Sequence, residues 1–257
     1  MSYFSLLKVE QIKLRRSHIV WILLIPVTLP WVMNVLNAGI HLSSQTISPE
    51  NNFFLQSFMG FVWLLYPATL MVSTVLLTQM EQSNRGLLKM LSLPLSPVKL
   101  CLAKFTVLLL LAALQFLLMD LLYFPSAWLA SQMNGYQFML SPLLVFQQSG
   151  MMFLTSLPMA ALYWMIATLL SSPVFSVGIG LASIVPSVLI LNTKIWYCYP
   201  PCYSFYWLTQ LMGQMSDPSG QFQFQWIPFL PVAVGLLAVF LVVSCLCFGR
   251  TERRSFS

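Results

Sequence analysis

Long apolar stretches alternate with short polar segments along the whole chain. Six of the stretches are each about 20 residues long, which is the length of an α-helix that crosses roughly 30 Å of hydrocarbon. They cover residues 18–37, 57–78, 102–124, 146–170, 174–191 and 226–248. The pattern predicts an all-α, polytopic membrane protein with six transmembrane helices, arranged as a single domain over residues 1–257.

The composition supports the same conclusion. Hydrophobic residues make up 58% of the chain and charged residues only 7%, whereas soluble domains are about 25% charged. The first apolar stretch is long and lacks a small-residue cleavage site, so it is typical of a signal anchor rather than of a cleaved signal peptide. We therefore expect a multi-pass protein of the cell (plasma) membrane.

The positive charges gather in three segments. These segments contain Lys8, Lys13, Arg15 and Arg16; Arg85, Lys89, Lys99 and Lys104; and Arg250, Arg253 and Arg254. The remaining basic residue, Lys194, lies in the loop after the fifth stretch. Loops rich in Lys and Arg stay in the cytoplasm, so both termini and the loop after the second stretch are predicted to be cytoplasmic. This distribution also argues against nucleic acid as the partner of a chain whose net charge is +6.

The segment 80–104 is basic but too apolar for a solvated loop. Its apolar residues are Leu87, Leu88, Met90, Leu91 and Leu93. Pro94 and Pro97 would break a helix, so we expect a short helix, a turn, and then the third transmembrane helix. The segment is either an interfacial helix on anionic lipid headgroups or a docking element for a cytoplasmic partner.

Part of this segment resembles the permease subunits of type-2 ABC exporters. The resemblance is carried by Glu81, Gly86-Leu-Leu-Lys89, Leu91, Leu93-Pro94, Ser96 and Lys104. Within that superfamily it is most similar to the group of lantibiotic (bacteriocin) immunity and bacitracin-type peptide exporters. Pro97 stands where relatives often have Arg.

The resemblance implies a permease that exports an amphipathic or antimicrobial peptide, giving immunity or resistance. It implies two further partners, a cytoplasmic ABC ATPase dimer and a second permease copy or a different permease subunit. It places the ATPase-docking contacts on Glu81, Arg85, Leu87, Leu88, Lys89, Leu91 and Pro94. The rival hypothesis is a non-transporting membrane scaffold or sensor that recruits a cytoplasmic partner.

The chain itself carries no nucleotide-binding or metal-binding pattern. None of its 11 Gly residues begins a G-x-x-x-x-G-K-[ST] loop, so ATP is expected to bind the partner and this chain is not expected to be an enzyme. Its two histidines, His18 and His41, show no metal-ligand spacing with the cysteines. Cys198 and Cys202 are predicted to lie outside, where a disulfide between them requires suitable geometry.

Polar and small residues within the apolar stretches are candidates for a substrate path or a subunit interface. They are Thr69, Ser73 and Thr74 in the second stretch, Asp120 in the third, and Gly178, Gly180, Ala182 and Ser183 in the fifth. Small residues allow close helix packing in lipid, within one subunit or between two. Asp120 lies roughly 24 Å beyond Lys104 along a helix, which suggests the outer headgroups and leaves a path role and a packing role open.

Two further segments are expected to lie at the membrane surface. In residues 1–17, a helical arc contains Phe4, Leu7, Gln11 and Leu14, which predicts an amphipathic interfacial helix that either anchors to lipid or buttresses the ATPase. The outer loop 192–226 is rich in aromatic residues, which favour the membrane–water interface. Short helices in that loop would form an aromatic belt or contact an amphipathic substrate.

Overall fold

The computed structural model describes residues 3–16, 19–42, 46–82, 96–170, 172–216 and 226–254, and every regular element in these ranges is helical. The elements are α1 (Tyr3–Arg16), α2 (Ile19–Leu36), α3 (Ala38–Leu42), α4 (Pro49–Gly60), η1 (Phe61–Leu65), α5 (Tyr66–Gln82), α7 (Pro97–Asn134), α8 (Pro142–Leu169), α9 (Pro173–Ala182), α10 (Val185–Leu191), η2 (Trp196–Cys198), η3 (Pro200–Cys202), α11 (Tyr203–Ser216) and α12 (Trp226–Arg254).

Five helical stretches within the described ranges are long and apolar enough to cross a membrane. They are Pro49–Gln79, Pro97–Asn134, Pro142–Leu169, Pro173–Leu191 and Trp226–Phe248, and a sixth, Trp21–Leu36, is apolar but shorter. The stretch Pro173–Leu191 is interrupted by a turn at residues 183–184, which separates α9 from α10. The predicted all-α, polytopic membrane architecture is therefore confirmed.

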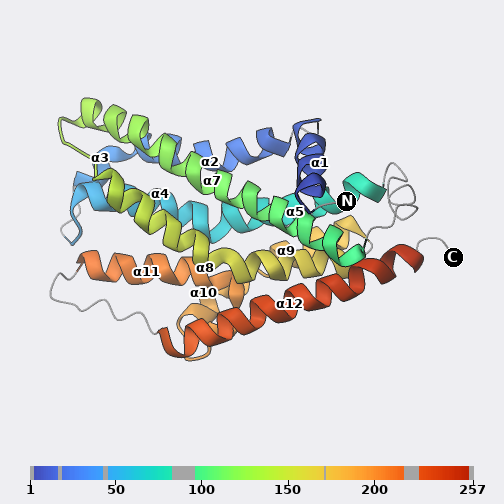
Figure 1. The fold of residues 1–257 in the computed structure, drawn as a ribbon. Helices are drawn as coiled ribbons and strands as arrows, with labels where there is room; N and C mark the ends of the chain where they lie inside the picture. The colour runs from blue at the N-terminus through green and yellow to red at the C-terminus, as the bar shows by residue number, and fades with distance from the viewer. Residues whose placement is uncertain are drawn as a thin grey trace.

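The long helices run side by side, with α8 packed against α5, α7, α11 and α12 (Figure 1). The short helix α1 lies across their direction. It sits at the same end of the bundle as the C-terminal end of α12 and the start of α7 (Figure 1). The first and last helices thus reach the same end of the bundle, as expected for a chain that crosses the membrane an even number of times. Which side is the cytoplasm stays a prediction that depends on the Lys and Arg distribution.

Two segments that the apolar pattern left as outer loops are largely helical, so those predicted boundaries are wrong. Residues 38–56 contain α3 and most of α4, which begins with Pro49 at its first position and has Glu50 in its first turn, both favourable at a helix N-terminus. Residues 125–145 contain the end of α7, which continues through Pro125 to Asn134.

Gly135 explains where α7 ends. Its φ of 64° is in the left-handed region, and its N–H donates to the carbonyl of Ser131. Glycine adopts this conformation without the penalty of a Cβ atom. Pro125 removes one N–H from the helix interior, which membrane helices tolerate when neighbouring groups compensate. With 38 residues, α7 is about 57 Å long and extends beyond a bilayer core of about 30 Å.

An aromatic cluster holds α2, α4 and α7 together. Trp31 of α2 lies 5.5 Å from Tyr123 of α7 and 5.8 Å from Phe53 of α4, measured between ring centroids. The indole Nε1 of Trp31 also donates to the carbonyl of Met119 at 3.1 Å. Because lipid is as apolar as the side chains, such packing and hydrogen bonding stabilise helix association where the hydrophobic effect does not.

The aromatic residues after α10 fold against the bundle. Trp196 stacks on Tyr206 at 3.7 Å and on Phe229 at 5.5 Å between ring centroids, so η2, α11 and α12 meet in one cluster. Trp196, Tyr203 and Tyr206 are buried in the protein. These three rings therefore make intramolecular contacts rather than face the surrounding membrane–water interface.

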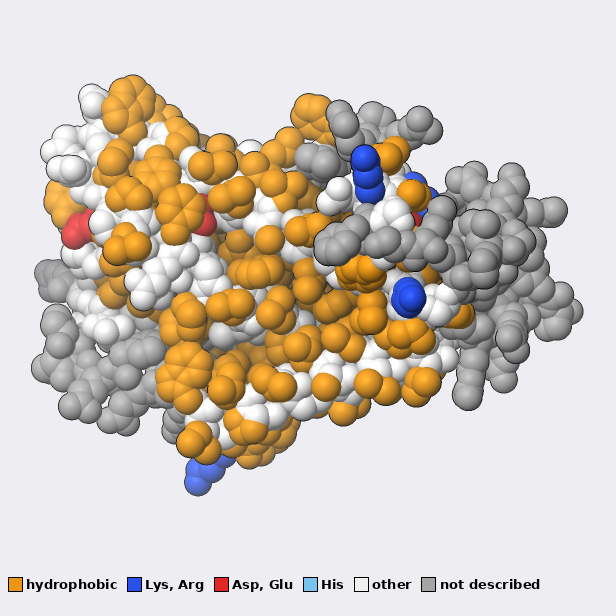
Figure 2. Space-filling view, in the orientation of Figure 1, with side chains coloured by type: hydrophobic (Ala, Val, Ile, Leu, Met, Phe, Trp, Pro, Cys, Tyr) orange, Lys and Arg blue, Asp and Glu red, His pale blue; other side chains and the backbone are white. Residues whose placement is uncertain are grey.

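The surface of the bundle is mostly apolar. In Figure 2, hydrophobic side chains cover the middle of the molecule, and most of the visible Lys and Arg side chains lie at the end that carries α1. On α12, Leu230, Val234, Val242 and Leu246 are all more than half exposed. A soluble protein would bury such side chains, so this face is suited to lipid.

Candidate functional site

The predicted ATPase-docking residues lie outside the described part of the chain. Residues 83–95 are not described, and α5 ends at Gln82 with the Glu81 side chain also outside the description. None of Glu81, Arg85, Leu87, Leu88, Lys89, Leu91 or Pro94 can therefore be placed against a neighbour. The structure does describe the helix that follows them. Pro97 occupies the first position of α7 after the N-cap residue Ser96, where a missing N–H costs no hydrogen bond.

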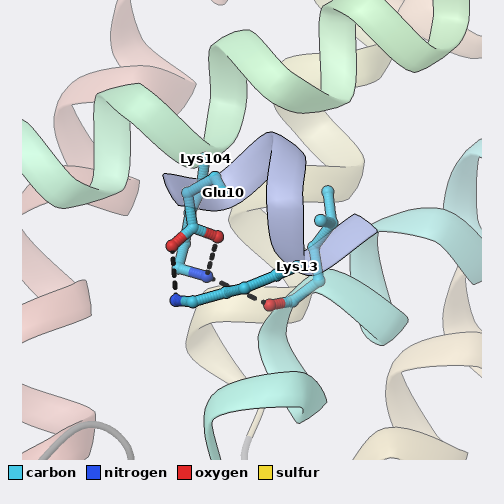
Figure 3. A network of polar contacts seen from close by, with 4 residues as sticks. Glu10, Lys13 and Lys104 are labelled. Atoms are coloured by element: carbon cyan, nitrogen blue, oxygen red, sulfur yellow. Dashed lines mark hydrogen bonds and ion pairs between the residues drawn. The ribbon is translucent and has the colours of Figure 1, made fainter. Parts of the chain in front are cut away.

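A cluster of charges joins α1 to the bundle near the start of α7 (Figure 3). Lys104 Nζ of α7 lies 3.2 Å from Glu10 Oε2 of α1, and Lys13 Nζ lies 2.6 Å from Glu10 Oε1. The ammonium group of Lys104 also donates to the carbonyl of Leu77 in α5 at 3.3 Å. The cluster therefore connects three helices near the start of α7, with Glu10 linking α1 to α7 and Lys104 linking α7 to α5.

Burial makes this cluster energetically important. Only 1% of Lys104 and 3% of Glu10 are exposed. Burial by itself raises the pKa of Glu10, but the neighbouring Lys104 and Lys13 outweigh it and hold the pKa below its ordinary value of 4.5. The ionised carboxylate is thus the stable form at neutral pH, and its stabilising contribution is lost only as the pH falls below that ordinary value.

The rest of α1 packs on α7 as well. The hydroxyl of Tyr3 lies 2.6 Å from that of Thr106, and Leu6 and Leu14 are buried. The buried stripe is therefore Leu6, Glu10 and Leu14, whereas Gln11, which the sequence pattern assigned to the apolar arc, is exposed. Sequence reasoning missed Glu10, although its spacing of four residues from both Leu6 and Leu14 places it on the buried face.

Two of the three polar candidates of α5 form hydrogen bonds inside the bundle. Gln115 of α7 donates from Nε2 to the hydroxyl of Thr69 at 2.8 Å, and Thr74 donates to the carbonyl of Met71 at 2.6 Å. The hydroxyl of Ser73 is buried and has no hydrogen-bond partner among the described residues. Thr69 therefore links α5 to α7, and Thr74 is bound to its own helix.

Asp120 is buried between α7 and α8. Ser149 of α8 donates its hydroxyl to Asp120 Oδ2 at 2.6 Å, and 3% of the aspartate is exposed. The other carboxylate oxygen, Oδ1, has no hydrogen-bond partner among the described residues. The side chain therefore takes part in helix packing in this structure, and the helix continues past it to Asn134.

The small residues of the fifth apolar stretch divide between two faces. Gly180 faces α5, where a Cβ atom would lie 2.4 Å from Cγ of Met71. Ser183 lies 3.3 Å from the hydroxyl of Tyr163. Gly178 and Ala182 are exposed, and a Cβ atom on Gly178 would meet nothing within 4 Å. One face therefore packs within the subunit, and the other is open to lipid or to a second subunit.

This division predicts opposite outcomes for two glycine substitutions. Gly180→Leu should destabilise the single chain, since the new side chain would overlap Met71, and overpacking typically costs about 1–3 kcal/mol. Gly178→Leu should leave the melting temperature of the monomer unchanged but weaken association of two permease subunits. Thermal melting and crosslinking of single cysteines at positions 178 and 182, in a background without native cysteines, measure the two effects.

Two results would contradict this division. Equal destabilisation by Gly178→Leu and Gly180→Leu would show that both residues pack inside one subunit. Unchanged crosslinking through a cysteine at position 182 in Gly178→Leu would remove Gly178 from the interface.

Cysteine and metal chemistry adds no site in the described ranges. Cys198 is exposed, Cys202 is buried, and both are free thiols. The thiol of Cys202 lies within hydrogen-bonding distance of the carbonyls of Trp196 and Tyr199, at 3.2 and 3.0 Å. No group of three or more His, Cys, Asp or Glu side chains with the geometry to hold a metal ion occurs among the described residues.

Comparison with known proteins gives one family match. A model of a family described as ABC-2 family transporter protein matches residues 6–187, which is more than half of the chain. The matched range includes the charge cluster of Glu10 and Lys104, the predicted docking segment and the candidates Asp120 and Gly178. No curated protein and no solved structure matches the chain significantly.

Proposed function

The chain belongs to the ABC-2 family of transporter membrane proteins, and we propose that within this family it is the permease half-unit of an ATP-driven exporter of amphipathic peptides. Membership makes it the membrane component of an ABC transporter, which pairs with a separate ABC ATPase and does not hydrolyse ATP itself. The proposal adds the direction of transport and the substrate class, and with them a role in resistance to an antimicrobial peptide.

The observation that carries the substrate class is the chemistry of the polar groups inside the bundle. Many of them are uncharged amides and hydroxyls, such as Gln115 with Thr69 and Asn34 with Ser57. They lie among exposed and buried apolar side chains. An amphipathic peptide that passes through lipid presents the same combination, because its apolar side chains suit the surroundings while its backbone amides need hydrogen-bond partners.

We further propose that two permease subunits form the transport unit. The exposed face of α9 and α10 carries Gly178 and Ala182 next to the exposed apolar side chains of Val174, Val185 and Leu189. Small residues beside bulky ones permit close approach of a second helix in lipid. The inner face of α9 packs against Met71 of α5, so the exposed face is the one available to a partner subunit.

The predicted docking segment between α5 and α7 is assigned to the ATPase. Movement of that segment would act on α7 close to Lys104, which is held by Glu10 of α1 and by the carbonyl of Leu77 in α5. The charge cluster thus positions α1, α5 and α7 relative to one another where force from ATP hydrolysis would enter. ATP-dependent accumulation of a labelled amphipathic peptide in inside-out membrane vesicles tests the proposed function.

A further inference from the structure

An open groove lies between α2 and α3 on one wall and α4 and η1 on the other. Its volume is about 630 Å³, within the range of about 300–1,000 Å³ found for small-ligand sites. Apolar side chains such as Met33 and Ile40 line it, and both are more than half exposed. Polar side chains line it as well: Asn34, Asn37, His41, Asn52 and Gln56.

The groove coincides with an irregular turn of helix. Gly60 and Leu65 line the groove and bracket η1, a π-helical turn in which the N–H of Tyr66 donates to the carbonyl of Phe61 five residues before it. Such π turns are rare and occur frequently at functional sites. A Cβ atom on Gly60 would meet nothing within 4 Å, so this part of the groove is empty of other side chains.

Hydrogen bonds within the wall determine the tautomer of His41, which lines the groove. Asn34 Nδ2 donates to the carbonyl oxygen of Phe53, which can only accept, at 2.5 Å. The amide oxygen of Asn34 then faces His41 Nε2, and that nitrogen must donate. Burial lowers the pKa of His41, so the ring is neutral and its other nitrogen, Nδ1, is an acceptor.

The remaining polar groups of the wall are available to a ligand. Among the described residues, no hydrogen bond engages Nδ1 of His41 or the side-chain amides of Asn52 and Gln56, and the Asn37 amide uses its nitrogen only, to reach the carbonyl of Met33. Each amide can donate and accept at once. No Lys, Arg, Asp or Glu lines the groove. A complementary ligand is therefore uncharged along this stretch and carries both donors and acceptors beside apolar groups.

We propose that this groove binds an extended, uncharged segment of the peptide substrate. This inference rests on the proposed function and names a contact site for the substrate class. The amides of Asn52 and Gln56 pair with the N–H and C=O groups of the peptide backbone, and His41 Nδ1 accepts a hydrogen bond from a peptide N–H. The apolar side chains of the peptide lie against Met33 and Ile40.

The same chemistry explains the choice of a peptide over a sugar-bearing lipid. In hydrocarbon, each backbone N–H or C=O without a partner costs several kcal/mol, so an extended peptide needs a wall of amides along its length. The headgroup of a neutral glycolipid stays hydrated at the membrane surface and has no such need. A groove with amide groups on one wall and exposed apolar side chains beside them therefore fits the peptide better.

The test fills the groove without disturbing the wall. Gly60 has right-handed helical backbone angles, φ −63° and ψ −38°, so Gly60→Leu introduces no backbone strain and replaces the poorer helix former. Gly235→Leu is the matched control, because Gly235 also has open space around it but lies on α12, away from the groove. The full-length permease is placed in phosphatidylcholine nanodiscs without the ATPase, and fluorescence anisotropy measures binding.

The probe is a short peptide of alternating Leu and Gln, blocked at both ends and carrying an uncharged fluorophore. We expect saturable binding to the unaltered protein and to Gly235→Leu, and binding weakened about tenfold or more in Gly60→Leu. A version of the probe with methylated backbone nitrogens should bind about as weakly, since it has lost the N–H donors.

Three binding results would overturn the inference. They are equal binding by Gly60→Leu and the unaltered protein, equal binding of the methylated probe, and displacement of the probe by a neutral glycolipid at lower concentration than by unlabelled peptide. Loss of subunit association in Gly60→Leu would also contradict it by assigning the groove to a second permease copy. The binding assay contains no ATPase, so it can succeed even where ATP-driven transport fails. Failure of the groove proposal can therefore be distinguished from failure of the proposed export function.

Discussion

Glu10→Gln is expected to separate α1 from the bundle and to abolish transport. The substitution leaves Lys104, of which 1% is exposed, without the carboxylate that compensates its burial. Removing one partner of a buried ion pair typically costs about 3–5 kcal/mol, which is a large share of the stability of a typical protein. Thermal melting of the purified protein in detergent, together with recovery of the ATPase on the same affinity column, measures the loss.

Two further variants distinguish a specific ion pair from a general loss of packing. Lys104→Met should cost less than Glu10→Gln, because Glu10 keeps Lys13 at 2.6 Å and a methionine fills the space left by the lysine. The double variant Glu10→Lys with Lys104→Glu should recover part of the melting temperature that each single change loses. Two results would show that the charge cluster does not position α1. In one, the double variant melts at as low a temperature as the less stable of Glu10→Lys and Lys104→Glu. In the other, Glu10→Gln melts at the same temperature as the unaltered protein.

Replacing both Leu88 and Leu91 by Asp is expected to release the ATPase from the membrane. These residues lie outside the described ranges, and their assignment to the docking surface depends on their apolar character within a basic, predicted cytoplasmic segment. Burying a Leu side chain contributes about 1.5–3 kcal/mol, and an interface with a charge in its apolar centre loses more. We expect at least about a tenfold fall in the amount of ATPase that co-purifies.

The matched control changes two exposed apolar residues at the end of the bundle opposite α1. Leu42 and Met139 are 41% and 42% exposed, and neither lies within a candidate membrane span. Replacing both by Asp should leave the ATPase bound. Release of the ATPase by the control pair, or its retention by the Leu88 and Leu91 variant, would show that segment 80–104 is not the docking surface.

Local sequence patterns predicted the helices better than their ends. Runs of apolar residues indicated each membrane-spanning stretch because the length of such a run is set by the thickness of the bilayer. They did not indicate the extensions of α4 and α7, since helix beyond the hydrocarbon needs no apolar run. The third apolar stretch ends at residue 124, but α7 continues through Pro125 and ends only at Gly135, the residue with left-handed backbone angles.

The contacts that define the candidate sites could not be predicted from the sequence, because they join residues far apart in the chain. Glu10 and Lys104 are 94 residues apart, and Asn34 and Ser57 are 23 apart, so no local spacing shows that they meet. Glu10 is the one acid in a basic segment and was not among the predicted site residues, and His41 was considered only as a metal ligand. The small residues near Gly178 were recognised as a packing surface, but only the fold shows that Gly180 faces inward and Gly178 outward.

ATP-driven transport in inside-out vesicles is the measurement that bears most directly on the central claim. Vesicles that contain this chain and its ATPase partner should accumulate a labelled amphipathic peptide when ATP is added, and should stop when the ATPase carries a substitution in its nucleotide site. A peptide of the same composition without the amphipathic pattern serves as the control substrate and should not accumulate. Release of preloaded peptide from these vesicles on addition of ATP, or equal accumulation with the inactive ATPase, would contradict the assignment of the chain as the permease half-unit of a peptide exporter.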